Sequence, residues 1–509
     1  MVKCAKSAPK VLVWLLHGTR WILYPSYFTF NALISLFVVT FQEEDKLLRI
    51  FLRKLILGPV YAGLFTLFLP FLIFFLPLRC FLVVLRNKTP YVLSVRHTAL
   101  TDRETQYQNE LIDSNDYKFG AGTANLCIMS EFLSRMNHLT DVDERSQKMG
   151  ERIVVSQLFN DEWNKKVLKR KVVSQNSPGI LSPADSGVVN KVNNNVHRIL
   201  KKWTVEGDIT TKFNRLDFIM VQEAWSSYHN KMLIDELHKV FPYVVHDVSV
   251  HGFGVNRFCL SSGLLIASRH PIIEIDFKPF KNFILHGKLL SKGLLGVKVL
   301  LGSDTSERRK VGYLFNTHFQ SYQGTECVIA QQMDESIVSA RQFMEQTRHD
   351  NEQVMFSIMS GDFNCDNLSP CDQGTANHEL FNVYEDIARI RPGMDKPWTI
   401  GTEMRQRYML EPAVSTPEGL KAALDDPVLR QRYVVDGDIE LQSKEVLAAG
   451  LPKVDAQGNL ICRQEGGRRR IDYITLHKDY PVNVEGYHFV TQLASLTDHI
   501  PVAIEFTCP

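Results

Sequence analysis

The sequence lacks both a strong net charge and a disulfide pattern. Its 58 basic and 56 acidic residues leave a formal net charge of +2. Bulk electrostatics therefore give no support to a nucleic-acid partner, and any basic site must be local. The nine cysteines include no CxxC pair. This spacing favours free thiols in a reducing compartment over a disulfide-stapled secreted protein.

Charged residues are missing altogether from two stretches near the amino terminus, at about 21–41 and 55–78. Each stretch has roughly the 20 residues that cross the core of a bilayer. No short apolar core with a small-residue cleavage site marks a signal peptide. We therefore expect a helical membrane region over residues 1–90, followed by a juxtamembrane connector over 91–118.

Basic residues flank both apolar stretches on every side, so the positive-inside rule does not place the loop between them. Two arrangements stay open. One is a spanning helical hairpin, and the other is a pair of re-entrant or in-plane segments kinked at prolines. The basic flanks favour the second arrangement. Both arrangements leave the carboxy-terminal part of the chain in the cytosol.

The segment KLLRIFLRK at 46–54 combines apolar residues at helical spacing with four cations. It suits a grip on anionic lipid headgroups such as phosphatidylserine, and it equally suits a solvated connector. Cys4 and Cys80 lie beside the apolar stretches, where they are candidates for acylation.

The remainder of the chain alternates strand and helix patterns. A stretch rich in Ser, Asn, Pro and Gly predicts an exposed loop at about 174–195. Strands are expected at 119–129, 216–221, 262–267, 311–315, 354–359, 471–475 and 501–506, and helices at 230–240 and around 329–344. This alternation predicts a mixed α/β domain over 119–509, with sheets covered by helices.

Polar residues gather at the ends of the predicted strands. They are Gln222 and Glu223, Asn316 and His318, Asp362 and Asn364, Asp472, and Asp498 and His499. Singly, each has an ordinary structural explanation; Asp362 in SGDFNCD, for example, suits a turn. Together they predict a metal-dependent phosphodiester site. Attack on a phosphate needs a hard cation, a base for water, and donors for the phosphoryl oxygens.

The motifs QE, NTH, GDFN, RIDY and TDHIPV occur in that order, and they resemble those of the DNase-I-like endonuclease/exonuclease/phosphatase superfamily. Within it, the chain resembles the membrane-anchored neutral sphingomyelinases. The further marks are TANLC, SSGLLIASRHPI, LLSKG, KPWTIGT and GRRRIDYI, together with the two amino-terminal apolar stretches. The resemblance covers nearly the whole chain. It implies a four-layer α/β sandwich behind a helical membrane-associated region.

The resemblance also implies roles by matching position. Asn125 and Glu223 match the Mg²⁺ ligands, with Mn²⁺ as a substitute ion. His499 matches the general base that takes a proton from the attacking water, and Asp472 matches the acid that orients it.

Other matched positions surround the phosphate. Asp362 would position the nucleophile or the base, and Asn364 would donate to a phosphoryl oxygen. His318 would stabilise the phosphate or protonate the leaving alkoxide. Asp498 would support the metal shell or the loop that carries His499.

Lys292 matches a lysine that pairs, in the family, with an aspartate five residues earlier. That earlier position is Gly287 here. The departure puts such a switch in doubt without touching the chemistry.

The resemblance implies hydrolysis of sphingomyelin to ceramide and phosphocholine on a cytosol-facing Golgi or plasma membrane, without a nucleic-acid partner. A phospholipase C acting on glycerophospholipids or lysophospholipids is the alternative enzyme, and an inactive membrane scaffold is the alternative non-enzyme. A DNA endonuclease would need a basic, soluble surface. An inositol phosphate 5-phosphatase would carry WxGDxNYR and WCDR motifs, and neither occurs.

Overall fold

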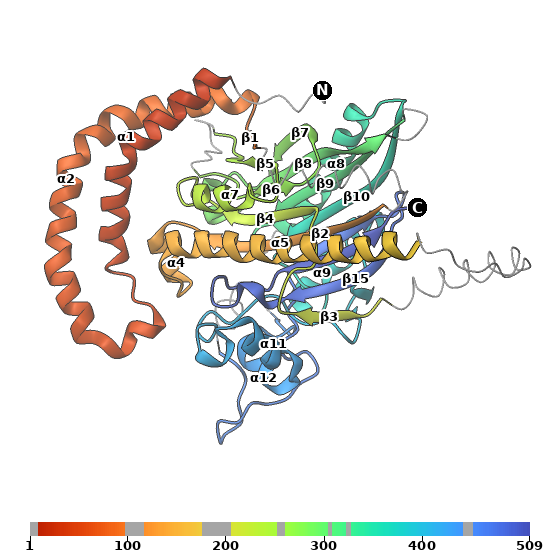
Figure 1. Ribbon diagram of the computed structural model, residues 1–509. Helices are drawn as coiled ribbons and strands as arrows, with labels where there is room; N and C mark the ends of the chain where they lie inside the picture. Colours follow the sequence, from red (N-terminus) through yellow and green to blue (C-terminus); the bar gives the residue numbers. More distant parts are fainter. Residues whose placement is uncertain are drawn as a thin grey trace, which may run out of the picture.

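Two β-sheets face each other in the globular part of the protein (Figure 1). The computed structural model describes residues 9–96, 117–175, 205–251, 260–303, 308–321, 327–440 and 451–509. The predicted loop at 174–195 lies almost entirely outside these residues, as does most of the predicted connector at 91–118. The first residues of that connector form an edge strand, β1 (Val92–Val95), which pairs with β5.

The first sheet has eight strands. Their order is β1, β5 (Tyr243–His246), β6 (Leu265–Ser268), β4 (Phe218–Ala224), β2 (Lys118–Ile128), β16 (Val502–Thr507), β15 (Asn483–Val490) and β3 (Gly207–Thr210). At its centre β2 runs parallel to β4 and antiparallel to β16. The carboxyl ends of β2 and β4 therefore lie at one edge of this sheet.

The second sheet has six strands. Their order is β11 (Tyr384–Asp386), β14 (Asp472–His477), β10 (Glu352–Asp362), β9 (Arg309–His318), β8 (Gly293–Ser303) and β7 (Ile272–Pro279). Here β9 and β10 are parallel, and β14 is antiparallel to β10. A separate hairpin joins β12 (Arg389–Arg391) to β13 (Met394–Asp395).

Helices cover the outer faces of both sheets, which gives the predicted four-layer sandwich. On the first sheet, Met149 and Ile153 of α5 (Val142–Gln175) and Leu233 of α7 (Asn230–Leu237) belong to the same apolar cluster as the strands. On the second sheet, Ile329 and Met333 of α8 (Val328–Thr347) belong to the same apolar cluster as the strands of that sheet. The remaining helices and 3-10 turns are α4 (Glu131–Met136), η3 (Leu285–Leu289), η4 (Pro370–Asp372), α9 (Gln373–Ala376), α10 (Leu380–Val383), η5 (Pro412–Val414), α11 (Pro417–Asp425), α12 (Pro427–Tyr433) and η6 (Thr491–Leu493).

Between the sheets lies an aromatic core. Phe356 of the second sheet contacts Phe119, Phe218 and Phe506 of the first, with ring centroids 5.3 to 5.6 Å apart. Each of these side chains is buried, and full burial of one phenylalanine contributes about 2 kcal/mol. The core therefore fixes how the two sheets meet.

Every predicted strand and both predicted helices are present, with shifted boundaries. The predictions did not include the strands β1, β3, β5, β7, β8, β11, β12, β13 and β15 or the long helix α5.

The amino-terminal region forms a helical hairpin, which we call the membrane arm. It consists of α1 (Lys10–Ser35), η1 (Phe41–Lys46), α2 (Leu47–Leu85) and η2 (Arg86–Lys88). The helices pack antiparallel, since Ser26 Oγ donates to the Phe68 carbonyl at 3.0 Å and the Phe30 and Phe65 rings lie 5.5 Å apart. In Figure 1 the arm is the red and orange arc beside the globular part.

The two predicted apolar stretches differ in the structure. Among the described residues, the helix over Phe41–Lys88 is the one that is long and apolar enough to cross a membrane. The first stretch, 21–41, is not a single helix. Its helical part belongs to α1, which begins at Lys10, includes Arg20 and ends at Ser35.

A close approach of two strands requires glycine at position 361. Gly361 pairs with Thr317 of the parallel strand β9. A Cβ atom at Gly361 would lie 1.9 Å from the Thr317 carbonyl oxygen, and the residue has a φ of +145°. Both features exclude an ordinary side chain immediately before Asp362.

We expect Gly361→Ala to lower the free energy of unfolding by on the order of 3 kcal/mol, because the strands must separate and the backbone is strained. Thermal unfolding of the full-length protein would measure this loss. Gly374→Ala is the matched control, since a Cβ atom there meets nothing within 4 Å. Equal unfolding temperatures for the two variants would contradict the prediction.

Candidate active site

Five of the predicted site residues meet where the two sheets face each other. Asn125 lies in β2 and Glu223 in β4, near the carboxyl ends of these parallel strands. His318 ends β9, Asp362 ends β10, and Asp472 begins the antiparallel strand β14. The strand directions therefore bring together residues that are far apart in the sequence.

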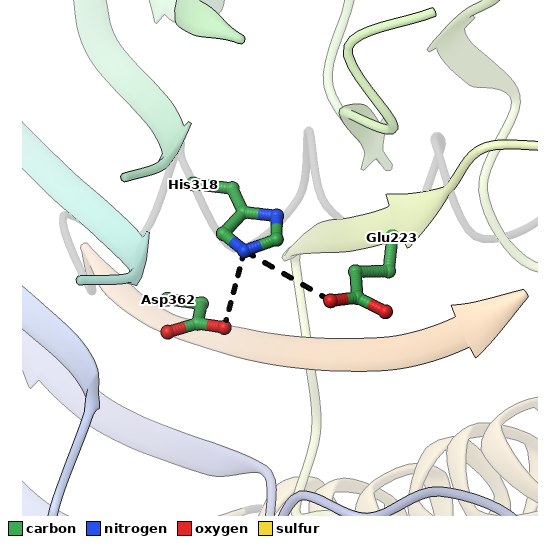
Figure 2. Close-up of side chains that lie close together, drawn as sticks. All are labelled: Glu223, His318 and Asp362. Carbon is green, nitrogen blue, oxygen red and sulfur yellow. Dashed lines mark ion pairs between the residues drawn. The ribbon is translucent and has the colours of Figure 1, made fainter. Parts of the chain in front are cut away.

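Three of the side chains form a cluster that could hold a metal ion. The ligand atoms of Glu223, His318 and Asp362 all lie within 4.8 Å of one another. His318 Nε2 is 3.5 Å from Asp362 Oδ2 and 3.9 Å from Glu223 Oε1. Figure 2 shows the imidazole facing both carboxylates. The sequence predicted Glu223 as a ligand but gave His318 and Asp362 other roles.

Asn125, the second predicted ligand, lies beside the same cluster. Its Nδ2 donates to Asp362 Oδ2 at 2.9 Å, and its Oδ1 accepts from the Cys127 amide at 3.1 Å. The amide thus orients Asp362 and lies within hydrogen-bonding range of the metal-ligand candidates.

Burial shapes the charges of these acids. It raises the pKa of Asp362 to about 7, with Asp472 adding to the rise and His499 opposing it. Burial also raises the pKa of Glu223, and the charge of Asp498 adds to this shift. Buried carboxylates that repel one another gain stability from a cation, and two carboxylates with a neighbouring amide suit a hard divalent ion.

The Glu223 backbone is itself unusual. Glu223 has a φ of +57°, in the left-handed region that few residues other than glycine adopt. Such conformations cluster at functional sites, where the surrounding structure maintains them.

His499 and Asp472, predicted as the general base and its orienting acid, lie in contact. Asp472 Oδ2 lies 2.9 Å from His499 Nδ1. His499 Nε2 lies 3.9 Å from Asp362 Oδ2, so this nitrogen faces the carboxylate cluster. Burial acts to lower the pKa of His499, but the charge and hydrogen bond of Asp472 outweigh it and hold the pKa well above its usual value.

Lys292 is buried near Asp362 and Glu223, whose charges act on it. Its Nζ donates to the Phe319 carbonyl at 2.5 Å. Burial lowers the pKa of Lys292 to about 8, against the charges of Asp362 and Glu223, which raise it. Gly287 lies in η3, and a Cβ atom there would be 2.2 Å from Gln320 Oε1. The Gln320 side chain thus occupies the space that a larger residue at position 287 would need.

Asn364 and Asp498 complete the predicted set. The Asn364 amide N–H donates to Asp362 Oδ1 at 2.9 Å, so SGDFN forms the turn that its composition suggests, and the same turn carries a site residue. Asn364 Nδ2 donates to the Phe319 carbonyl at 3.1 Å. Asp498 Oδ2 accepts from Gln406 Nε2 at 2.8 Å and from Asn137 Nδ2 at 3.4 Å.

Two polar residues from the strand ends lie outside the cluster. Gln222 Nε2 donates to Asn316 Oδ1 at 2.7 Å, and Asn316 Nδ2 donates to the carbonyls of Val221 and Leu265. Both side chains are fully buried. Their contacts tie the two sheets together beneath the site.

The sequence did not assign a role to the arginines of GRRRIDYI. Arg469 is buried and pairs with Asp366 at 2.7 Å and Glu403 at 2.6 Å, and Arg470 pairs with Asp386 at 2.6 Å. These pairs anchor the segments that flank Asp472. The run of three arginines before Ile471 was the sequence pattern that could have indicated these ion pairs. Their acidic partners, however, lie tens of residues away in the chain.

Relatives with established names match much of the sequence, although no family model does. Sphingomyelin phosphodiesterase 5 of Danio rerio is 26% identical over 97% of this chain and 96% of its own length. Sphingomyelin phosphodiesterase 3 of Homo sapiens is 35% identical over 57% of this chain, a match that covers 44% of the human protein. Sphingomyelin phosphodiesterase 5 of Mus musculus is 26% identical over 75% of this chain and 70% of its own length.

Solved structures give weaker likenesses. SmcL has a TM-score of 0.39 and 14% identity, covering 77% of this chain and 99% of SmcL. TDP2 of Caenorhabditis elegans has a TM-score of 0.36 and 11% identity, covering 78% of this chain and 76% of TDP2. By sequence, the chain is similar to the sphingomyelin phosphodiesterases 3 and 5, and its fold is the four-layer α/β sandwich described above.

Proposed function

We propose that this protein is a neutral, Mg²⁺-dependent phosphodiesterase that hydrolyses sphingomyelin to ceramide and phosphocholine at a cytosol-facing membrane leaflet. One observation carries the proposal. The pair of His499 and the buried Asp472 faces the cluster of Glu223, His318 and Asp362, in a chain whose relatives are named sphingomyelin phosphodiesterases.

His499 is placed to act on the attacking water. Asp472 lies at Nδ1 of the imidazole, which fixes the tautomer and leaves Nε2 directed toward Asp362. The neutral imidazole is the form that accepts a proton, and a cation held by Asp362 would oppose the carboxylate charges that raise the pKa of His499. A water near Nε2 would then give its proton to that nitrogen as its oxygen attacks phosphorus. Asp472 stabilises the imidazolium that results.

Glu223 and Asp362 would hold the cation, with the Asn125 amide beside them. When bound, Mg²⁺ supplies Lewis-acid stabilisation of charge on the phosphate. The donors fit such an ion, because the partly buried Glu223 and the buried Asp362 converge there and desolvation raises the pKa of each.

Lys292 and His318 supply positive charge and hydrogen-bond donors around the same point. The charges of Asp362 and Glu223 act on Lys292, and His318 lies between these two carboxylates. In the proposed reaction they stabilise the phosphoryl oxygens, and His318 or a water that it holds protonates the ceramide alkoxide as it leaves. Asn364 adds a donor from the turn after β10, and Asp498 supports the turn that carries His499.

The membrane arm supports an action at a bilayer. Its apolar side chains face outward; Phe74 is 75% exposed and Leu48 is 72% exposed. The arm also contacts the rim of the site, because Tyr24 stacks on Tyr228 with ring centroids 4.0 Å apart, five residues after Glu223. The active site therefore lies close to the surface that would enter lipid.

Contacts at both ends of the arm support in-plane or re-entrant insertion over a spanning hairpin. At the open end, Arg86 Nη2, directly after α2, donates to the Asp247 carbonyl at 2.8 Å. At the connection between the helices, the Phe41 amide donates to His138 Nδ1 at 3.0 Å, and Arg135 Nε donates to the Val38 carbonyl at 2.9 Å. A bilayer between these ends would break one set of contacts.

The length of α2 points the same way. Its 39 residues extend about 58 Å at the helical rise, roughly twice the thickness of the hydrocarbon core. Pro59, Pro70 and Pro77 lie inside this helix, and Figure 1 shows it curved. A curved helix of this length fits along one leaflet better than across both. The membrane that we propose is that of the Golgi or the plasma membrane.

The first prediction concerns the substrate. We expect the full-length protein in mixed micelles with Mg²⁺ to release phosphocholine from sphingomyelin faster than from phosphatidylcholine or lysophosphatidylcholine. His499→Ala and Asp362→Ala should each lower the rate by about two to four orders of magnitude, because each removes a group that acts in the transition state. Phosphocholine release measures the rate, and micelle binding should stay unchanged.

The same assay separates the alternatives. Turnover of glycerophospholipids alone would support the phospholipase C, and no turnover of any lipid would support the inactive scaffold. Phosphatidylserine in the micelles tests the basic segment at 46–54. Its cations predict a higher rate with this anionic lipid.

The second prediction concerns the metal ion. Asp362, whose pKa is raised to about 7, is protonated below that pH, and a cation must then displace the proton. We therefore expect the Mg²⁺ dissociation constant to rise about tenfold when the pH falls from 8 to 6. Calorimetric titration with Mg²⁺ measures this without substrate. Glu223→Gln should weaken binding at both values, and a constant affinity across this range would rule out Asp362 as a ligand.

The third prediction concerns the membrane arm. A cysteine introduced by Asp45→Cys, an exposed position in η1, should react with an impermeant maleimide added to the cytosolic side of sealed vesicles. The exposed Cys462 of the globular part is the internal control. Peptide mass spectrometry measures both sites. Labelling of position 45 only after the vesicles are opened, with Cys462 labelled beforehand, would establish a spanning hairpin instead.

A further inference from the structure

Thr402 ends the KPWTIGT segment and lies between the two residues that form the proposed base. Its side chain is fully buried. Thr402 Oγ1 accepts hydrogen bonds from the backbone amides of Ile471 at 3.0 Å and Asp472 at 3.1 Å. One hydroxyl therefore binds the backbone at the start of β14, at the residue that carries the Asp472 carboxylate.

The backbone of the same residue holds the turn that carries His499. The Thr402 carbonyl accepts from the Ile500 amide at 2.8 Å. The next residue, Glu403, forms an antiparallel bridge with His499, and the Met404 amide donates to the Asp498 carbonyl at 2.9 Å. Thr402 thus contacts Asp472 through its side chain and the His499 turn through its main chain.

A buried arginine fixes this crossing point to the rest of the site. Arg469 Nε pairs with Glu403 at 2.6 Å, and Arg469 Nη1 pairs with Asp366 at 2.7 Å. The Thr402 amide donates to the Arg469 carbonyl at 2.9 Å. The segment at 402–404 is therefore anchored on both sides, and it acts as a rigid spacer between β14 and the turn before β16.

We propose that Thr402 is a positioning residue that sets the contact between Asp472 and His499 by holding the backbone of both. The inference rests on the proposed function for its catalytic consequence, but the geometric claim stands independently of which diester is cleaved. Loss of the hydroxyl leaves two buried amides without their acceptor, so the start of β14 moves and the carboxylate moves with it.

Thr402→Val removes the acceptor and keeps the shape of the side chain. We expect kcat for sphingomyelin to fall about 10- to 100-fold while KM changes little, because a displaced orienting acid affects the reacting geometry and leaves lipid binding intact. Thr402→Ser keeps the hydroxyl, and it should restore kcat to within about threefold of the parent protein.

Thr399→Val is the matched control for a purely structural role. Thr399 is buried in the same segment, its Oγ1 donates to the Lys396 carbonyl at 2.8 Å, and it accepts from Arg468 at 2.8 Å. We expect this variant to lower the unfolding temperature about as much as Thr402→Val does, with kcat unchanged. Equal losses of kcat in the two variants would overturn the proposal.

A measurement without turnover separates this inference from the proposed function. The imidazole N–H of His499 that faces Asp472 should give a downfield proton resonance, assigned by its absence in His499→Ala. The resonance should shift or broaden in Thr402→Val and stay in place in Thr402→Ser and Thr399→Val. An unchanged resonance in Thr402→Val overturns the positioning role, even for an active enzyme. A shifted resonance in a protein that hydrolyses no sphingomyelin upholds it and refutes the proposed function.

Discussion

The hydrogen bond from Asn125 to Asp362 joins the two sheets at the point where the site forms. Asn125 and Glu223 come from the first sheet, whereas His318, Asp362 and Asp472 come from the second. Neither sheet holds a complete set of groups. Every distance in the site therefore depends on how the sheets pack, and the phenylalanine core and the buried pair of Gln222 and Asn316 maintain that packing.

Burial shifts the pKa values of these residues, and burying their charges costs free energy. Removal of water raises the pKa of Glu223 and Asp362 and lowers that of Lys292. Such groups are expensive to bury alone, and here each lies near a charge of opposite sign or a hydrogen-bond donor. The buried arginines Arg469 and Arg470 are likewise paired with the carboxylates of Asp366 and Asp386. These ion pairs anchor the loops around the site.

The membrane arm adds a second constraint. Both ends of the hairpin contact the globular part, at Asp247 and at His138, while most of its apolar side chains face outward. One of the contacted segments follows Glu223 directly, and another, α4, precedes Asn137, which donates to Asp498. The surface that would enter lipid and the candidate active site are thus attached to the same short segments.

The sequence alone determined which residue types lie at strand ends and which stretches are apolar. Short-range periodicity records both properties, so it predicted the strand that leads to Asp362, the α8 helix and a mixed α/β domain, whereas the family resemblance implied the four-layer sandwich. The ordered motifs also identified the family that the relatives support. The sequence did not predict the strands β7, β8 and β15, because packing against another layer decides where they lie. It also did not predict that the helix α1 ends at Ser35, inside the first apolar stretch.

Tertiary structure alone decided which polar residues meet. Gln222 and Glu223 are neighbours with similar local patterns, yet one ties the sheets together and the other lies in the carboxylate cluster. The grouping of His318 with Glu223 and Asp362, and the position of Thr402 between Asp472 and His499, depend on contacts between segments 27 to 139 residues apart, as the numbering shows. Strand pairing and sheet packing create such contacts, and no local pattern in the chain encodes them.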